Sequence, residues 1–314
     1  MINNEYVAVT VRDNLGYRVR RRGQVLAYQI FGPVWMAKIY YRIVMKEKLN
    51  LRNPQTFTEK ICWYKLFYCP KNELVIQCSD KFTVRSFLEG LGLGDYLSGL
   101  IGVWENPERI RWEELPRRFA LKNSNGCGYN IICKDKAYLD ERETKKLLKK
   151  WLGEHFGYYN AEPHYEVGRK RIICEEYIES AHLLPIDYKI HCMNGVAKVL
   201  QVCDERTAKE TKYLYYDMEG HPLDFGKYPQ KMDMDITSEM LADMNRICGI
   251  IAPYFPYVRI DFFVNQGKLQ IGELTFSPSA GLKPDLKYGN GDWIMGQMLD
   301  MNFDVHRIRT STFR

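Results

Sequence analysis

Two carboxylates inside an apolar hairpin constrain this chain more than any other feature of its sequence. Residues 258–278 read VRIDFFVNQGKLQIGELTFSP, in which Asp261 and Glu273 interrupt two strand-like apolar runs. Burying ionised carboxylates is costly unless cations or hydrogen-bond donors compensate them. A fold that contains this segment must therefore bring a partner to each acid.

The turn between the two runs decides whether the acids share a face of the sheet, because side chains alternate along a strand. A three-residue loop over 265–267 would pair Asp261 with Ile271 and Arg259 with Glu273. The acids would then be diagonal neighbours on one face, about 5–8 Å apart. A loop one residue shorter would place them on opposite faces. Glycine as the third loop residue favours the longer loop, so we predict a shared face.

Two acids at that separation, with the hydroxyl of Thr275 nearby, can hold one or two magnesium ions. Mg²⁺ binds through one or two carboxylates and completes its shell with phosphate oxygens. Alternatively, Glu273 pairs with Arg259 across the strands as a structural ion pair. The hairpin leaves both interpretations open, and a metal site requires a phosphate-binding partner elsewhere in the chain.

Residues 122–130, KNSNGCGYN, are a candidate for that partner. Lys122 ends an apolar run, and the Gly-rich polar turn after it offers backbone N–H groups to anionic oxygens. Turns of this kind also occur as plain surface loops. The strand-like segment IICEEYIE (172–179) suits an adenosine site, with backbone groups of Glu176 and Ile178 facing the base and an acid on the ribose.

The net charge of +6 is concentrated in the first 48 residues, which hold nine Lys/Arg and three acidic residues. The rest of the chain is balanced. A nucleic-acid-binding protein usually carries a basic patch on its folded body and a recognisable motif. Neither is evident here, so we exclude nucleic acid as a partner.

Residues 24–48 are apolar and aromatic but contain Gln29, Pro33, Lys38 and Arg42, too many interruptions for a membrane span. Lys38, Arg42 and Lys46 recur every fourth residue, which predicts a helix with one basic stripe. Such a helix either packs on the domain with its cations in solvent or lies on an anionic membrane surface. The arginines among residues 18–22 favour peripheral membrane contact through residues 12–48.

Helical periodicity dominates the first part of the chain and strand-like alternation the second, which predicts an α+β fold. Nine cysteines without a C-x-x-C motif indicate reduced thiols in a cytoplasmic protein. We expect strands on both sides of the 122–130 turn, a hairpin at Asn194–Gly195, and helices over 58–68, 79–92, 139–156, 237–255 and 292–301.

As a set, these segments resemble the ATP-grasp ligases, and more closely the TupA-like ATP-grasp family, which is found with bacterial capsule and teichuronopeptide genes. The resemblance covers about residues 40–300. It is carried by the hairpin, the Gly-rich turn and CEEYIE, and by five blocks in order: LNLRNPQTFTEKICWYKL (49–66), SDKFTVR (79–85), GVWENPERIRWEELPRRFALK (102–122), DYKIHCMNG (187–195) and GELTFSPSAG (272–281).

The resemblance implies an ATP-grasp fold, in which two α+β subdomains clamp ATP between antiparallel sheets. A basic, aromatic N-terminal extension (1–48) would precede a catalytic region (49–314). That region would comprise a helical part, an ATP-covering subdomain and a metal-binding subdomain, over residues 49–116, 117–186 and 187–314.

The resemblance also implies roles for individual residues. Lys81 or Arg85 matches the first phosphate-binding cation and Lys122 the second, and Arg259 matches the arginine that stabilises the developing oxyanion. The remaining matches are the phosphate-covering loop (Ser124, Asn125, Gly126, Cys127, Gly128), the adenine segment (Glu175, Glu176, Tyr177, Ile178), the ribose acid (Asp187 or Glu179), the nucleotide-site lysine Lys189, and the metal ligands (Asp261, Glu273, with Thr275 where many relatives have asparagine).

The implied reaction is ATP- and Mg²⁺-dependent amide formation between a carboxylate and an amine. The implied setting is bacterial capsular or cell-surface polysaccharide synthesis, with a uronic-acid-type and lipid-linked carboxylate, at the inner face of the cell membrane. Three alternatives stay open. They are a glycosyltransferase that uses Asp233-Met234-Asp235, a sugar kinase on the same fold, and an inactive membrane-associated scaffold, which the departure of the covering loop from the N-H-G-S-G of the family would suit.

Overall fold

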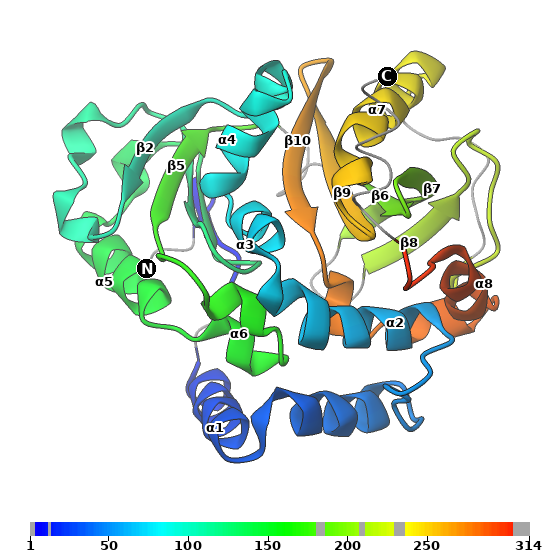
Figure 1. Cartoon of the computed structure of the whole chain (residues 1–314). Coiled ribbons are helices and arrows are strands. Elements are labelled where there is room, and N and C mark those ends of the chain that lie inside the picture. Colours follow the sequence, from blue (N-terminus) through cyan, green and yellow to red (C-terminus); the bar gives the residue numbers. More distant parts are fainter. Residues whose placement is uncertain (1–3, 12–13, 180–185, 207–210, 229–235, 304–314) are drawn as a thin grey trace.

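The computed structural model describes residues 4–11, 14–179, 186–206, 211–228 and 236–303. It contains two five-stranded antiparallel sheets surrounded by helices, which confirms the α+β class. The sheets lie side by side in Figure 1, with helix α1 (Leu15–Val44) running beneath both and α2 (Phe57–Trp63) beneath the right-hand one. The acidic pair at 233 and 235, a candidate sugar-nucleotide motif, lies outside the described residues.

The first sheet contains the predicted strands on either side of the Gly-rich turn. Its strand order is β1-β4-β3-β5-β2. On one face, Leu148 and Trp151 of helix α5 (Glu141–Leu152) complete a buried core. The strands are β1 (Val7–Val9), β2 (Leu100–Trp104), β3 (Phe119–Asn123), β4 (Asn130–Cys133) and β5 (Ile172–Glu176), and the short helix α6 (Phe156–Tyr159) follows α5.

The second sheet contains the hairpin with the two acids. Its order is β10-β9-β6-β7-β8, and Asn194–Gly195 forms the predicted turn between β6 and β7. Helix α7 (Ser238–Ile251) packs its apolar side into the core of this sheet. The strands are β6 (Asp187–Met193), β7 (Val196–Arg206), β8 (Thr211–Tyr216), β9 (Tyr257–Asn265) and β10 (Lys268–Thr275).

Two of the predicted helices begin at other residues than the sequence suggested. Helix α2 starts at Phe57, one residue before the predicted helix, because Thr56 caps it in a reciprocal capping box with Glu59. The predicted helix over 79–92 is shorter: only α4 (Thr83–Gly90) lies within it, and a helix that was not predicted, α3 (Glu73–Ser79), ends where the predicted one was to begin. Asp80 separates α3 from α4. Its carboxylate accepts hydrogen bonds from the backbone N–H groups of Phe82, which precedes α4, and of Thr83, which begins it.

Helix α1 is the predicted basic helix, and it is kinked. Gly32 adopts a left-handed conformation (φ 73°) and Pro33 follows it, so the regular hydrogen-bond pattern is interrupted there. The second half buries Met36, Ala37 and Tyr41 against the body. No helix among the described residues combines the length and the apolar character that crossing a bilayer requires.

A buried carboxylate ties three helices together beneath the sheets. Asp292, in α8 (Gly291–Met298), is 5% exposed. It accepts hydrogen bonds from the backbone N–H and the hydroxyl of Thr58 in α2, both at 2.8 Å. The same hydroxyl lies 2.9 Å from the hydroxyl of Tyr41 in α1. The C-terminal helix is thereby anchored to the two helices that begin the chain.

We expect Asp292→Ala to lower the free energy of unfolding by about 2 kcal/mol, because it leaves buried donors of Thr58 unsatisfied. Urea unfolding followed by circular dichroism measures the change. Asp224→Ala, at an exposed acid, is the matched control and should stay within about 0.5 kcal/mol of the wild type. Equal effects of both variants would contradict the anchoring role.

Candidate functional site

The turn of the β9–β10 hairpin has two residues, so the predicted three-residue loop is wrong. Asn265 pairs with Lys268, which leaves Gln266 and Gly267 as the turn. Their φ angles are 50° and 76°. Two successive left-handed residues match the type I′ turn, whose twist suits a tight antiparallel hairpin.

A β-bulge at Gly272 restores the shared face that the short turn would otherwise abolish. The pairing shifts by one residue between Ile271 and Glu273, so Glu273 lies directly opposite Asp261. The predicted pairs with Ile271 and Arg259 are therefore wrong, whereas the shared face is confirmed. An extra residue of this kind re-aims side chains next to functional sites.

Asp261 is the centre of a buried charge network. Arg259 donates from Nε to Oδ1 and from Nη2 to Oδ2, both at 2.6 Å. Lys189, the cross-strand partner of Asp261 on β6, donates to Oδ2 as well and lies 2.8 Å from Asp187. Burial alone would lower the pKa values of Lys189 and Arg259, but the Asp261 carboxylate raises both overall.

Glu273 is less committed than Asp261 and faces a cavity. It accepts a hydrogen bond from the hydroxyl of Thr275 at 3.1 Å, and it lies 3.6 Å from both Lys81 and Arg259. Burial favours the neutral acid, but the cations, Lys81 first, lower its pKa overall. The fork of Arg259 is engaged by Asp261, so the simple Arg259–Glu273 ion pair considered from the sequence is at most a longer contact.

Lys81 and Lys122 form the cationic wall opposite the acids. Lys122, on β3, pairs with Glu175 of β5 at 2.5 Å, and Arg85 of α4 lies 3.6 Å from the same carboxylate. Lys81, in the turn before α4, donates to the backbone carbonyl of Gly126 at 2.5 Å. Glu175 thus orients Lys122 and Arg85 and does not itself line the cavity.

The Gly-rich loop contributes its tip to the cavity. Gly126 and Gly128 have φ angles of 79° and 82°, a conformation that residues with a Cβ rarely adopt. Ser124 and Asn125 are buried and turn inward. The Ser124 hydroxyl donates to Asp80 at 2.6 Å, and the Asn125 amide donates to the backbone carbonyl of Tyr165.

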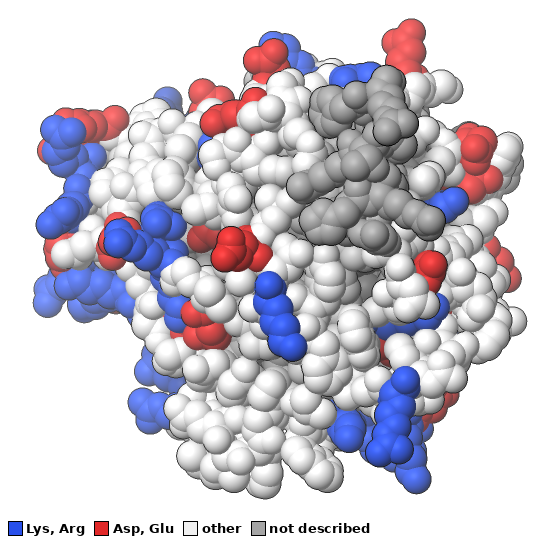
Figure 2. All heavy atoms as spheres, in the orientation of Figure 1, with Lys and Arg blue, Asp and Glu red and all other residues white. Residues whose placement is uncertain are grey.

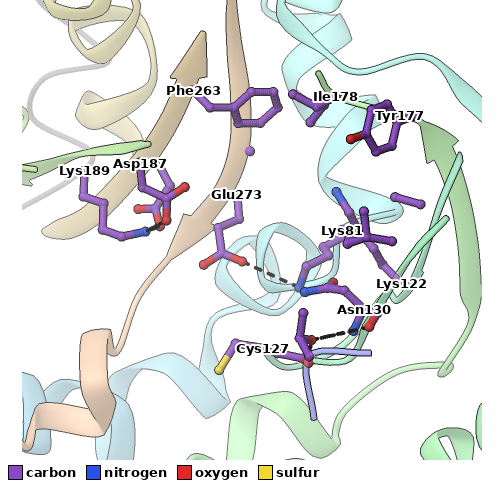
Figure 3. A pocket seen from close by; sticks show the side chains of 16 residues that line it. Lys81, Lys122, Cys127, Asn130, Tyr177, Ile178, Asp187, Lys189, Phe263 and Glu273 are labelled. Atoms are coloured by element: carbon purple, nitrogen blue, oxygen red, sulfur yellow. Dashed lines mark hydrogen bonds and ion pairs between the residues drawn. The ribbon is translucent and has the colours of Figure 1, made fainter. Parts of the chain in front are cut away.

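The cavity between the two sheets has a volume of about 280 Å³. Figure 3 shows Phe263, Tyr177 and Ile178 at one end, with Glu273 and Lys81 facing each other beyond them. Ten residues predicted for the site line it: Lys81, Lys122, Cys127, Gly128, Tyr177, Ile178, Asp187, Lys189, Asp261 and Glu273. The other predicted residues are not part of this lining: Arg85, Ser124, Asn125, Gly126, Glu175, Glu176, Arg259 and Thr275.

Of the two predicted ribose acids, Asp187 lines the cavity. Glu179 instead forms an ion pair with Arg118, outside the cavity lining. The two residues occupy different elements, since Asp187 begins β6 and Glu179 follows β5. The geometry therefore favours Asp187 for any contact with a ligand in this cavity.

Several lining residues were missed in the sequence: Thr10, Ala120, Asn130, Ile132, Phe263 and Gly272. Strand alternation carried a signal for some of them. Phe263 follows Asp261 by two residues, and Ala120 precedes Lys122 by two. Their cross-strand partners on β4 are Ile132 opposite Ala120 and Asn130 opposite Lys122. Thr10 had no local signal, because it reaches the cavity through the pairing of β1 with β4.

Lys283 is a further cation that the sequence analysis did not single out. Its Nζ lies 2.9 Å from the centre of the Tyr213 ring and 3.9 Å from Asp285. Burial, together with the smaller effects of Arg259 and Lys189 and against that of Asp285, lowers the pKa of Lys283 to about 8. The cations near Asp261 and Glu273 therefore include Lys283 as well as Arg259 and Lys189.

The arrangement suits a nucleotide with a divalent cation. The apolar end can receive a base, and Lys81 and Lys122 are placed for anionic oxygens. A carboxylate has about four lone-pair sites, and Arg259 and Lys189 use three of those on Asp261. One site on Asp261, the oxygens of Glu273 and the Thr275 hydroxyl remain as hard donors, which are the ligands Mg²⁺ prefers.

Comparison with known proteins places this chain in a family. The sequence model of the family described as TupA-like ATPgrasp matches residues 59–299. No curated protein matches the chain. The family match confirms the resemblance seen in the sequence and, with it, the ATP-grasp fold.

Solved structures similar to this chain include ATP-grasp ligases. The ligase PsnB complexed with minimal precursor is 12% identical, with a TM-score of 0.42, over 74% of this chain and 62% of that one. D-alanine–D-alanine ligase from Bacillus anthracis complexed with ATP is 14% identical, with a TM-score of 0.45, over 75% of this chain and 68% of that one. D-alanine–D-alanine ligase from Helicobacter pylori is 13% identical, with a TM-score of 0.43, over 77% of this chain and 69% of that one. The chain thus spans about two thirds of the length of these proteins.

We expect the two acids to differ in their effect on stability. Asp261→Asn should lower the free energy of unfolding by about 3 kcal/mol or more, because it leaves Arg259 buried without its hydrogen-bonded counter-charge and Lys189 with Asp187 alone. Glu273→Gln should cost less than about 1 kcal/mol, because its ion pairs are long and partly solvated. Urea unfolding of both variants measures this, and equal losses would contradict the central role of Asp261.

Lys283 should make stability depend on alkaline pH. Between about pH 8 and 10.5, the unfolded chain retains the Lys283 proton that the folded protein has lost, so stability rises with pH. We expect the free energy of unfolding of the wild type to rise by about 2 kcal/mol relative to that of Lys283→Met across this window. Urea unfolding at several pH values tests this, with Lys198→Met, at an exposed lysine, as the control that should follow the wild type.

Proposed function

Since this chain belongs to the TupA-like ATP-grasp family, we propose that it is an ATP-dependent carboxylate–amine ligase. A carboxylate attacks the γ-phosphate of ATP to give an acyl phosphate and ADP, and an amine then displaces phosphate to form the amide. The observation that carries this proposal is the placement of Asp261 and Glu273 opposite Lys81 and Lys122 across one cavity with an apolar end. Phosphoryl transfer requires mainly such positioning and charge neutralisation.

Each part of the site has a role in this reaction. Lys81 and Lys122 bind the phosphates, and Arg85 holds Glu175, which orients Lys122. The 124–128 loop covers the phosphates, while the 175–178 segment and Phe263 enclose the base. Asp187 receives the ribose. Lys189 holds two acids in place, Asp187 on its own strand and Asp261 on β9.

The second set of roles concerns the reacting centre. Asp261, Glu273 and the Thr275 hydroxyl would hold Mg²⁺, which would supply positive charge to the phosphate oxygens. Arg259 has its Nε and Nη2 atoms engaged by Asp261 and Thr275. Its remaining nitrogen, Nη1, is available to stabilise the oxyanion that forms when the amine attacks.

We further propose the substrate class and the cellular setting. The carboxylate is a uronic-acid-type group of a bacterial capsular or cell-surface polysaccharide, and the amine is an amino acid or a related small molecule. The reaction takes place in the cytoplasm, at the inner face of the cell membrane, where ATP and a lipid-linked acceptor are both present. The association of the family with polysaccharide genes supports this class.

An assay of ADP release tests the proposal. The protein is incubated with ATP, Mg²⁺, a panel of uronic-acid glycans and a panel of amino acids, and ADP should form only when both partners are present. We expect Glu273→Gln to lower the rate by roughly a hundredfold, because phosphate charge is then less well neutralised. Glu239→Gln, at an exposed acid of α7, is the matched control and should keep the wild-type rate.

The other outcomes separate the rival functions. ADP release with a neutral, hydroxyl-bearing sugar alone would indicate a kinase. Absence of both ATP binding and turnover would indicate a scaffold and overturn the proposal. Wild-type turnover in Glu273→Gln would refute the metal-binding role of that residue.

A further inference from the structure

The outer face of helix α1 is unusually apolar for a protein surface. Most of the exposed large hydrophobic side chains among the described residues lie on this one helix. They include Trp35 at 61% exposure and Ile30 at 63%. In both halves of the helix they recur about every fourth residue, on the side away from the body: Leu15, Val19, Leu26, Ile30 and Phe31, then Trp35, Ile39, Ile43 and Val44. Contiguous apolar surface of this kind marks an interaction site.

Specific contacts hold the opposite face of α1 on the body. The guanidinium of Arg21 stacks on the Tyr159 ring at 4.0 Å, and Tyr28 stacks on Tyr158 at 4.1 Å. Further along, Tyr41 meets Thr58. These contacts fix the rotation of the helix, so its apolar outer face is a stable feature of the folded protein.

Basic side chains border the apolar face, and α1 contains no acidic residue. Arg18, Arg20 and Arg22 are exposed in the first half, and Lys38 and Arg42 in the second. In Figure 2 the lower end of the molecule, where α1 lies in Figure 1, is largely free of charge and has Lys and Arg side chains on both sides. Apolar residues flanked by cations are typical of helices that lie in a membrane interface.

A groove beside the helix continues the positive surface. It has a volume of about 490 Å³ and runs between the first half of α1 and the end of α5. Arg18, Arg21 and Arg22 line one side, and Lys149 and Lys150 line the other, with Glu154 as the acid among them. Positive charge is therefore gathered at this end of the molecule from two separate elements.

Charge decides which partner this surface fits. Residues 49–314 hold thirty-six basic and thirty-six acidic residues, so a second copy of the chain offers a neutral body to a basic face. An anionic lipid surface offers both complements at once, acyl chains for the apolar side chains and headgroups for the arginines and lysines. We propose that α1 docks the protein onto anionic membranes, with Trp35, Ile39 and Ile43 entering the headgroup boundary.

Vesicle flotation without ATP tests this docking separately from catalysis. The full chain should float with vesicles of phosphatidylglycerol and phosphatidylcholine, float much less with phosphatidylcholine alone, and dissociate in high salt. Trp35→Ser with Ile39→Ser, and Arg18→Glu with Arg22→Glu, should each weaken binding by roughly tenfold or more. Trp293→Ser, at an exposed tryptophan of α8, is the matched control and should bind like the wild type.

Three results would overturn the proposal. They are absence of binding to anionic vesicles, equal binding to both vesicle types, and a loss in Trp293→Ser as large as that in the α1 variants. Light scattering tests the alternative partner, a second copy of the chain. A dimer that Trp35→Ser with Ile39→Ser dissociates, in a chain that does not float, would make α1 an interface between copies. Circular dichroism and ADP release of the α1 variants should match the wild type, which separates this test from that of the catalytic proposal.

Discussion

The carboxylate of Asp261 is the interaction on which the rest of the site depends. It lies within the second sheet at 4% exposure and is held by Arg259 on its own strand and Lys189 on the next. Removing one partner from such a buried group costs more than the pair itself contributes. The register of β6 against β9 must therefore bring Lys189 opposite Asp261, and it also sets the position of Asp187, whereas the register of β10 against β9 sets that of Glu273.

The cavity is close to charge balance before any ligand enters. Lys122 is paired with Glu175, and Lys81 faces Glu273. The four phosphate charges of a nucleotide would upset this balance on their own, whereas a nucleotide that arrives with a divalent cation largely preserves it. Burying charge in a region of low dielectric is costly unless it is compensated, so the proposed metal follows from the same constraint that organises Asp261.

In the β9–β10 hairpin, the local sequence predicted which side chains share a face but not how the two strands pair. Alternation along β9 predicted that Arg259, Asp261 and their neighbours share a face, and it would also have identified Phe263. The glycine at 267 indicated a turn but not its length, because both loop lengths place a left-handed residue there. The bulge at Gly272 compensates for the shorter turn. Two departures from the expected register cancel, so the shared face was predicted correctly from a wrong pairing.

The sequence by itself determined the α+β class, the strands around the Gly-rich turn, the basic helix at the start and the family to which the chain belongs. These features depend on periodicity, on turn residues and on ordered motif blocks, all of which are local along the chain. Only the tertiary structure decided that Lys189 compensates Asp261, that Glu175 pairs with Lys122, that Thr10 reaches the cavity and that the apolar side of α1 faces outward. Each depends on which distant segments pack together, and that choice is made by burying the whole core at once rather than by any one stretch of sequence.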